Sequence, residues 1–191
     1  MEEIESKEEY NTQRLAQLQS LPLNAKIMLT RKRVLEYYNH FDGQVYLSFS
    51  GGKDSTVLKH LIENYVGLNI PSVFINTGLE YPEVRKFAIS QSNVEIIRPK
   101  MTFRQVIEKY GYPVISKEQS DYIYQYKHAK SEKTKNLRLY GNNNSYKISE
   151  KWKFLLDAPF EISSECCKYM KKNPAKEYER ERTSPYNSNN D

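Results

Sequence analysis

Cysteine and histidine are scarce in this sequence, and their scarcity argues against several classes of protein. The two cysteines, Cys166 and Cys167, are adjacent, so they cannot build the disulfide framework of a small secreted domain. The three histidines occur without any Cys-x-x-Cys pair, which argues against a zinc ribbon or finger. We therefore expect a protein of a reducing, cytoplasmic compartment.

Long hydrophobic runs are also missing. No segment approaches the roughly 20 apolar residues that a membrane-spanning helix needs, and the acidic start, Met1-Glu2-Glu3-Ile4-Glu5, is unlike a signal or transit peptide. Without the tyrosines, the apolar fraction falls from 38% to about 30%, which is lean for a globular protein. We expect one domain with a core built from a few apolar segments, and no membrane partner.

The surplus of positive charge lies in one half of the chain. Residues 1–100 carry 12 basic and 12 acidic side chains, whereas residues 101–191 carry 17 and 12. Within that half, residues 116–152 are rich in tyrosine and lysine, and such side chains can stack on bases and neutralise phosphates. A nucleic-acid partner is one interpretation. Acidic residues in the same stretch favour the alternative of a solvated helix and loop. The acidic first helix and the basic second half also suit a homo-oligomer or a protein partner.

The hydrophobic pattern predicts an α/β fold. Short apolar runs at 45–49, 72–76 and 94–97 are typical of buried strands, and the amphipathic segments 55–65 and 82–92 are typical of helices. Alternation of strands and helices with short links indicates a Rossmann-like open parallel sheet with helices on both faces.

Further helices are expected before and after this alternation. Asn24 is the expected N-cap of a helix that precedes the first strand. Thr102 and Gln105 have the spacing of a capping box. Ser163 would cap a later helix that carries both cysteines near its first turn. Asn173-Pro174 would end that helix and start the last one, at about 174–182.

These elements predict the organisation of the chain. We expect an N-terminal helical extension at 1–23 and an α/β core at 24–115. A polar, basic, tyrosine-rich helical segment at 116–182 would belong to the same domain. Residues 183–191 have the composition of a disordered tail.

A glycine-rich loop follows the first predicted strand and reads Ser50-Gly51-Gly52-Lys53-Asp54-Ser55. Its glycines allow a tight turn close to an anion, and the following helix presents its positive end there. Lys53 adds a positive charge, and the serine hydroxyls can donate to phosphate oxygens. Asp54 would either cap the helix or meet a metal ion that accompanies a nucleotide. We interpret the segment as a phosphate loop; an ordinary glycine-rich turn is the alternative.

The loop resembles that of the ATP pyrophosphatase (PP-loop, adenine nucleotide alpha hydrolase-like) superfamily. The longer stretch from Asp42 through the loop resembles the phosphoadenosine phosphosulfate (PAPS) reductase-like branch, as does Asn76-Thr77-Gly78-Leu79-Glu80-Tyr81-Pro82-Glu83. Weaker likenesses at Gly111-Tyr112-Pro113 and Ser116-Lys117 extend the resemblance over about residues 24–178. The resemblance implies an adenine nucleotide bound across the carboxyl ends of parallel strands, with Mg²⁺.

The resemblance also implies roles for individual residues. The residues that would hold phosphates are Ser48, Ser50, Gly51, Gly52, Lys53, Asp54 and Ser55. The residues that would lie beside the nucleotide are Asn76, Thr77, Gly78 and Glu80. Lys53 and Asp54 would be the catalytic pair, with Asp54 also a metal ligand. For the second group, simple turn chemistry and a solvated carboxylate are the alternatives.

The cysteines limit the chemistry that the resemblance implies. Thioredoxin-dependent PAPS reductases need a cysteine in a C-terminal segment, and none follows Cys167. Iron–sulfur relatives add a later Cys-x-x-Cys to an adjacent pair, and two thiolates alone cannot hold a four-ligand cluster. We therefore expect neither sulfonucleotide reduction nor an iron–sulfur cluster from this chain alone. Near a helix start and several lysines, Cys166 and Cys167 would have lowered thiol pKa values and could serve redox or sulfur handling. Packing in the core is the alternative.

The intact Lys53-Asp54 pair resembles members of the superfamily that cleave ATP between the α and β phosphates. We therefore predict a protein that binds ATP or a sulfated adenine nucleotide and acts as a transferase of the adenylyl-transfer type. The alternative is a catalytically inactive nucleotide-binding module, or a protein that regulates a partner with the same fold.

Overall fold

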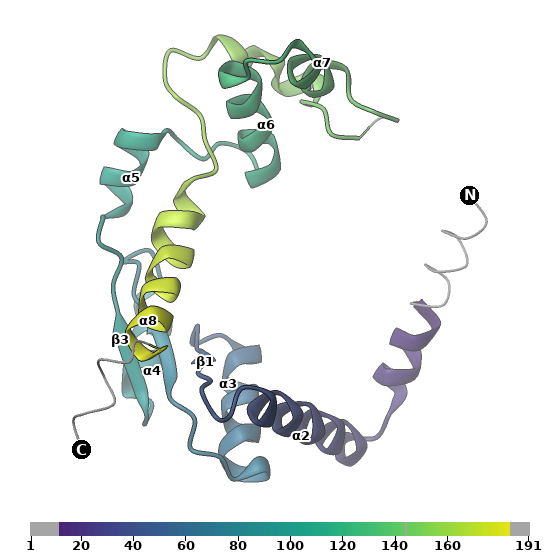
Figure 1. The fold of residues 1–191 in the computed structure, drawn as a ribbon, viewed down its shortest axis with the longest axis vertical. Coiled ribbons are helices and arrows are strands. Elements are labelled where there is room, and N and C mark those ends of the chain that lie inside the picture. Colours follow the sequence, from purple (N-terminus) through teal and green to yellow (C-terminus); the bar gives the residue numbers. More distant parts are fainter. Residues whose placement is uncertain (1–11, 144, 184–191) are drawn as a thin grey trace. The chain divides into compact units, whose positions relative to one another are not determined.

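The computed structural model describes residues 12–143 and 145–183 and confirms the predicted α/β fold (Figure 1). Three strands, β1 (Leu47–Ser48), β2 (Ser72–Ile75) and β3 (Val94–Ile97), form an open parallel sheet in the order β1-β2-β3. The helical segments between consecutive strands make this parallel arrangement possible, because neighbouring parallel strands need a crossover connection.

The chain divides into two units, which are described separately. The N-terminal unit contains the described residues up to Phe74 together with Lys86–Glu95, and the C-terminal unit contains Ile75–Arg85 and the described residues from Ile96 onward. Most of the sheet therefore belongs to the N-terminal unit.

The two ends of the chain lie largely outside the described residues. In the predicted N-terminal extension, residues 1–11 are outside, and residues 12–20 are helical. Of the predicted disordered tail at 183–191, all but Thr183 lie outside. Among the described residues, no helix is both long enough and apolar enough to cross a membrane.

Helix α2 (Leu23–His40) packs against α3 (Lys53–Leu61) and against the π-helical turn η1 (Ile62–Val66) in the N-terminal unit (Figure 1). The prediction that Asn24 caps α2 is wrong. The N-cap is Pro22, whose φ of −63° suits the approach to a helix, so α2 has already begun at Asn24.

The first strand is shorter than the predicted run 45–49. The backbone N–H of Val45 donates to the carbonyl of Gly43 at 2.8 Å, so the chain is still turning at that point. Beyond it, Leu47 N–H donates to Pro71 and Phe49 N–H to Val73, each at 2.9 Å. These two bonds join β1 to β2 and fix the start of the glycine-rich loop at the carboxyl end of β1.

The core of the N-terminal unit lies between the sheet and its helices and consists of Leu47, Phe49, Ile62, Ile70, Phe74 and Ala88. Burial alternates along β1, where Ser48 is exposed between two buried apolar residues. In α3, Val57 is exposed, whereas Lys59 is only 5% exposed and pairs with Glu63. The apolar stem of a lysine can pack in this way while its ammonium group reaches a carboxylate.

One buried hydroxyl in β2 has no hydrogen-bond partner among the described residues. It is the Oγ atom of Ser72, whose side chain is 1% exposed. A buried hydroxyl without a partner is destabilising because it has lost its hydrogen bonds to water.

Helix α4 (Pro82–Ser90) connects β2 to β3, and the remaining helices belong to the C-terminal unit. They begin with α5 (Phe103–Tyr110), α6 (Lys117–His128), α7 (Glu132–Tyr140) and the 3₁₀ segment η2 (Glu150–Asp157). The predicted capping box at the start of α5 is confirmed. The Thr102 hydroxyl accepts the backbone N–H of Gln105, and the Gln105 side chain accepts the backbone N–H of Thr102. Helix α6 packs against both α7 and η2.

The last helix begins at Cys166, passes through the π-helical turn η3 (Lys168–Lys172) and continues without a break as α8 (Asn173–Thr183). The helix predicted at about 174–182 is therefore present in α8, whereas the prediction that Asn173-Pro174 ends the preceding helix is wrong. Proline lacks an N–H donor and its ring clashes with the carbonyl four residues earlier in a regular α-helix. The wider π turn before Pro174 accommodates the proline, because its hydrogen bonds skip one residue more.

The C-terminal unit has a core of its own, which consists of Tyr122, Ile123, Ile148 and Ile162. It is tied to the loop after α5 by backbone hydrogen bonds, from Tyr112 N–H to Glu161 at 2.8 Å and from Ser163 N–H to Tyr112 at 3.1 Å. The basic, tyrosine-rich stretch is therefore ordered largely as helix around apolar residues.

Candidate functional site

The glycine-rich loop after β1 is closed by its own serines. Ser50 Oγ lies 3.1 Å from Ser55 Oγ, and the backbone N–H of Ser50 donates to Ser55 Oγ at 3.3 Å. Ser55 Oγ in turn donates to the carbonyl of Gly52 at 3.0 Å. Gly51 has a φ of +72°, a left-handed conformation that favours glycine. The two serines and two glycines therefore build one tight turn, as the sequence predicts.

Thr56 contributes to the loop in a way that the sequence motif does not reveal. Its hydroxyl donates to the carbonyl of Gly52 at 2.9 Å, and its backbone N–H donates to the same oxygen at 3.0 Å. A Ser or Thr four residues after a helix N-cap is the signal that could have indicated this bond. The carbonyl at the N-cap is thus fixed by three donors, which orients the first turn of α3.

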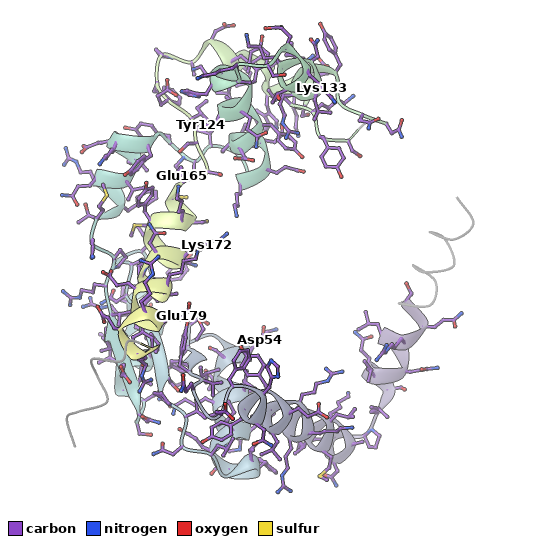
Figure 2. All side chains as sticks on the ribbon, in the orientation of Figure 1. Asp54, Tyr124, Lys133, Glu165, Lys172 and Glu179 are labelled. Atoms are coloured by element: carbon purple, nitrogen blue, oxygen red, sulfur yellow. The ribbon has the colours of Figure 1, made fainter. Side chains whose placement is uncertain are left out.

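The start of α3 presents positive potential at the loop. Lys53, Asp54 and Ser55 are its first three residues, and the first N–H groups of any helix have no acceptor within the helix. Both the Lys53 and the Asp54 side chains are exposed. Asp54 is labelled in Figure 2. Asp54 does not cap the helix, because the N-cap is Gly52 and no side chain bonds there. The capping role expected for Asp54 is therefore wrong.

The second predicted group of residues follows β2 and forms a compact loop of its own. Asn76 is buried, and its Oδ1 atom accepts the backbone N–H of Gly78 at 3.2 Å. Gly78 has a φ of +80°. Asn76 N–H donates to the carbonyl of Ile97 at 2.9 Å, which anchors the loop to β3.

Glu80 closes this second loop and is not simply a solvated carboxylate. Its Oε1 atom accepts the Thr77 hydroxyl at 2.6 Å, and its Oε2 atom accepts the Gly78 N–H at 3.1 Å. Partial burial raises the pKa of Glu80, but the hydrogen bonds from Thr77 and from the backbone outweigh that effect and lower it overall. Glu80 is therefore ionised at neutral pH and is held as a hydrogen-bond acceptor.

The cysteines lie together at the start of the last helix, and both are free thiols of intermediate burial. The expected fall of the thiol pKa is wrong for Cys166. Burial raises the pKa of Cys166, and the neighbouring Cys167 raises it further. The nearest lysine in sequence, Lys168, has its charge engaged by Glu165 at 2.7 Å. Desolvation therefore outweighs the helix start and the lysines at this position.

The predicted residues form three groups along the chain. The phosphate loop and Ser48 lie in the N-terminal unit, the loop from Asn76 to Glu80 lies in the C-terminal unit, and the cysteines directly precede η3 in that same unit. Within residues 12–143 and 145–183, no three His, Cys, Asp or Glu side chains gather closely enough to hold a metal ion by themselves.

Comparison with protein families identifies the class to which this fold and loop belong. The model of the phosphoadenosine phosphosulfate reductase domain matches residues 44–141, just over half of the 191-residue chain. The chain therefore belongs to the phosphoadenosine phosphosulfate reductase domain family, a member of the adenine nucleotide alpha hydrolase-like superfamily. The match includes the phosphate loop and the loop that follows β2. Comparisons with curated proteins and with solved structures find no match.

Proposed function

We propose that the chain binds an adenine nucleotide with its phosphates in the loop from Ser50 to Ser55. The observation that carries the proposal is the turn at Gly51, which joins the carboxyl end of β1 directly to the N-terminus of α3. Open α/β sheets bind ligands at the carboxyl ends of their strands, and helix N-termini favour phosphate. Membership of a family whose fold binds adenine nucleotides supports the same ligand.

Each loop residue has a role that follows from its position. The free N–H groups at the start of α3 donate to phosphate oxygens, and the exposed ammonium group of Lys53 neutralises their charge. Ser50 and Ser55 already hold the turn, so the loop needs little rearrangement to receive an anion. Exposed Ser48, at the end of β1, adds a hydroxyl beside the loop.

Asp54 fits the role of a Mg²⁺ ligand. Mg²⁺ at nucleotide sites is commonly held by one or two carboxylates together with substrate phosphates, so a single exposed carboxylate suits it. The ion would neutralise charge on the phosphates. Asp54 itself, held in the first turn of α3, would orient that charge toward the loop.

The loop after β2 supplies the second set of proposed contacts. Asn76, Thr77, Gly78 and Glu80 follow the carboxyl end of a parallel strand, the end at which nucleotides bind in this class of fold. The Glu80 carboxylate fixes the loop through Thr77 and Gly78. We propose that its main role is to hold this loop in shape beside the nucleotide.

The proposed reaction is cleavage of ATP between the α and β phosphates. A nucleophile attacks the α-phosphorus, the bond from that phosphorus to the bridging oxygen breaks, and pyrophosphate leaves with the bond's electron pair. The nucleophile is water or an acceptor that receives the adenylyl group and loses its proton. Lys53 and the loop N–H groups stabilise the charge that grows on the leaving pyrophosphate.

A nucleotide-binding module without turnover is the second candidate, and the state of Glu80 favours it. A general base works best with a pKa near the working pH, whereas the pKa of Glu80 is lowered. Cys166 does not supply a general base either, because its raised pKa keeps the thiol protonated at neutral pH. A redox or sulfur-handling role for Cys166 and Cys167 remains a prediction.

Two measurements on the purified chain test these proposals. Calorimetry with ATP and Mg²⁺ should show binding that Lys53→Ala abolishes and that Lys86→Ala, an exposed lysine on α4, leaves intact. Detection of AMP and pyrophosphate would establish turnover. Binding without these products would support the module, and binding that survives Lys53→Ala would show that the phosphate loop is wrongly assigned.

A further inference from the structure

The C-terminal unit contains two cavities that neither of the two loops lines. The larger, of about 660 Å³, lies between α6 and the helix formed by η3 and α8; the smaller, of about 400 Å³, lies beside α5 and α6. Glu165 and Lys168 line both, so the cavities adjoin along this shared wall. We refer to the two together as the aromatic–lysine cleft.

The smaller cavity is lined by two stacked pairs of rings. Tyr110 and Tyr169 stack with their centroids 4.1 Å apart and 11° between their planes. Tyr124 and His128 stack at 4.2 Å and 26°. A hydrogen bond between the first pair lowers the pKa of the Tyr110 phenol and holds the two rings together. Planar bases stack on tyrosine rings in proteins that bind single-stranded nucleic acid.

The larger cavity is lined by a row of lysines. Lys168, Lys172 and Lys176 follow one another at intervals of four residues along η3 and α8, so they share one side of the helix, and Lys117 joins them from α6. Lys172 is labelled in Figure 2. All four side chains are exposed. Eight residues of helix rise by about 12 Å, so the row is long enough to meet more than one phosphate.

The carboxylates of the larger cavity offset part of this row. Glu165 pairs with Lys168 at 2.7 Å. Glu118 and Asp121 line the same cavity and accept hydrogen bonds from the neutral side chains of Tyr122 and Gln125, so they keep their negative charges. Lys172 and Lys176 form no ion pair with any residue that the structure describes. Their charges are therefore available to a ligand.

We infer that the aromatic–lysine cleft binds nucleotide units of a single-stranded nucleic acid, with bases at the tyrosines and phosphates at the lysines. A simple anion would have no use for the stacked rings, and an apolar ligand would have no use for the lysines. The chemistry recognised is a base that carries a phosphate, and the length of the lysine row favours a strand over a free nucleotide. The inference does not rest on the nucleotide proposed for the phosphate loop.

The lysine row is tested with a fluorescent single-stranded DNA of mixed sequence, whose binding is followed by anisotropy at several salt concentrations. Affinity should fall as salt rises, because each neutralised phosphate releases counterions. Lys172→Gln should weaken binding and reduce the slope of log affinity against log salt by about 0.7. The matched control is Lys133→Gln on α7, an exposed lysine outside the cleft, which should change neither. Equal losses in both variants would overturn the inference.

The rings are tested at Tyr169. Tyr169→Leu should lower the affinity for the same DNA by roughly 5- to 150-fold, the range expected for loss of one stacked base. Tyr169→Phe keeps the ring and should keep the affinity, even though the hydroxyl contact is lost. Tyr140→Leu, at a 70% exposed tyrosine outside the cleft, is the control. Unchanged affinity in Tyr169→Leu would contradict the stacking role.

Two further experiments test whether DNA binds at the cleft or at the phosphate loop, and whether the cleft prefers a strand to a free nucleotide. Lys53→Ala should leave DNA binding intact; its loss would show that DNA binds at the phosphate loop, which overturns the cleft but not the proposed function. AMP should compete with the DNA only at concentrations far above those of an unlabelled strand. Competition by AMP at equal concentration would overturn the preference for a strand.

Discussion

The two proposed sites are built from different materials. In the N-terminal unit the phosphate loop consists of backbone N–H groups, two glycines and one lysine, and its shape is held by short-range bonds between Ser50 and Ser55. In the C-terminal unit the aromatic–lysine cleft consists of side chains that come from α5, α6, η3 and α8. A site made of backbone depends on local conformation, whereas a site made of side chains depends on how helices pack.

This difference explains where the charge of the chain lies. The phosphate loop belongs to the first 100 residues, whose basic and acidic side chains are equal in number. For the proposed binding of phosphates, backbone dipoles and one lysine are sufficient in this loop, because a helix N-terminus carries roughly half a positive charge. The surplus of five positive groups in residues 101–191 includes the lysines of the cleft.

The largest expected effect is a loss of stability in the core of the C-terminal unit, and it tests whether the two units unfold separately. Ile123→Ala removes a fully buried side chain from the core of the C-terminal unit and should destabilise that unit by about 2–5 kcal/mol. The only tryptophan, Trp152 in η2, reports on this unit during urea unfolding. Its unfolding midpoint should fall while the midpoint for loss of ATP binding stays unchanged. A parallel shift of both midpoints would mean that the units unfold as one.

The next effect tests the dependence of the phosphate loop on backbone conformation. Gly51→Ala places a side chain at a φ of +72°, which costs about 1–2 kcal/mol and should weaken ATP binding roughly 5- to 30-fold. Gly67→Ala is the matched control, with a φ of +79° and open space around its Cβ position. It should destabilise the chain to a similar extent and leave the calorimetric affinity for ATP unchanged.

A smaller effect, in this case a gain in stability, is expected from a substitution in β2. Ser72→Ala removes the buried hydroxyl that has no partner among the described residues, and it should raise the free energy of unfolding by about 1 kcal/mol. Urea denaturation measures the change. Ser90→Ala is the control, at an exposed serine in α4 whose hydroxyl donates to the Phe87 carbonyl, and it should not stabilise the chain. A loss of stability in Ser72→Ala would show that the hydroxyl is bonded in solution.

The smallest effect concerns the pH dependence of the loop after β2. Because the pKa of Glu80 is lowered on folding, its contribution to stability is full above the unfolded value, near 4.5, and is lost as pH falls through the folded pKa. Glu80→Gln should therefore reduce stability at neutral pH, and the difference from the unmodified chain should shrink below about pH 4.5. Glu83→Gln, at an exposed carboxylate in α4, is the matched control. Equal profiles would argue against the hydrogen-bonded role of Glu80.

The contrast between the sites also explains how much could be predicted from the sequence. The strands, the capping box at Thr102 and the turn of the phosphate loop depend on neighbouring residues, and the sequence predicts them well. The stacking of Tyr110 on Tyr169 joins residues 59 positions apart, so no local pattern indicates it. The pKa of Cys166 was mispredicted because burial, which depends on packing, outweighs the charges visible in its neighbourhood.

Two further errors concern prolines and the ends of helices. Pro22 starts α2 earlier than the expected cap at Asn24, and Pro174 continues a helix that it was expected to end. In each case the sequence correctly indicates that proline lacks an N–H donor and has a fixed φ, but the conformation of the neighbouring backbone determines whether the helix starts, ends or continues there. At Pro174 the π turn η3 allows the helix to continue, and no residue pattern within η3 predicts that turn.

That π turn has a consequence for the evolution of the helix surface. It contains one residue more than an α turn, so it acts as a one-residue insertion inside a continuous helix. Because the wider turn takes up this residue within a single turn, the helix beyond it keeps its direction. Deleting one residue from η3 would place Lys176 seven residues after Lys168, and residues seven apart share one side of an α-helix. An insertion or deletion of one residue at η3 would therefore keep the row of lysines on one side of the helix.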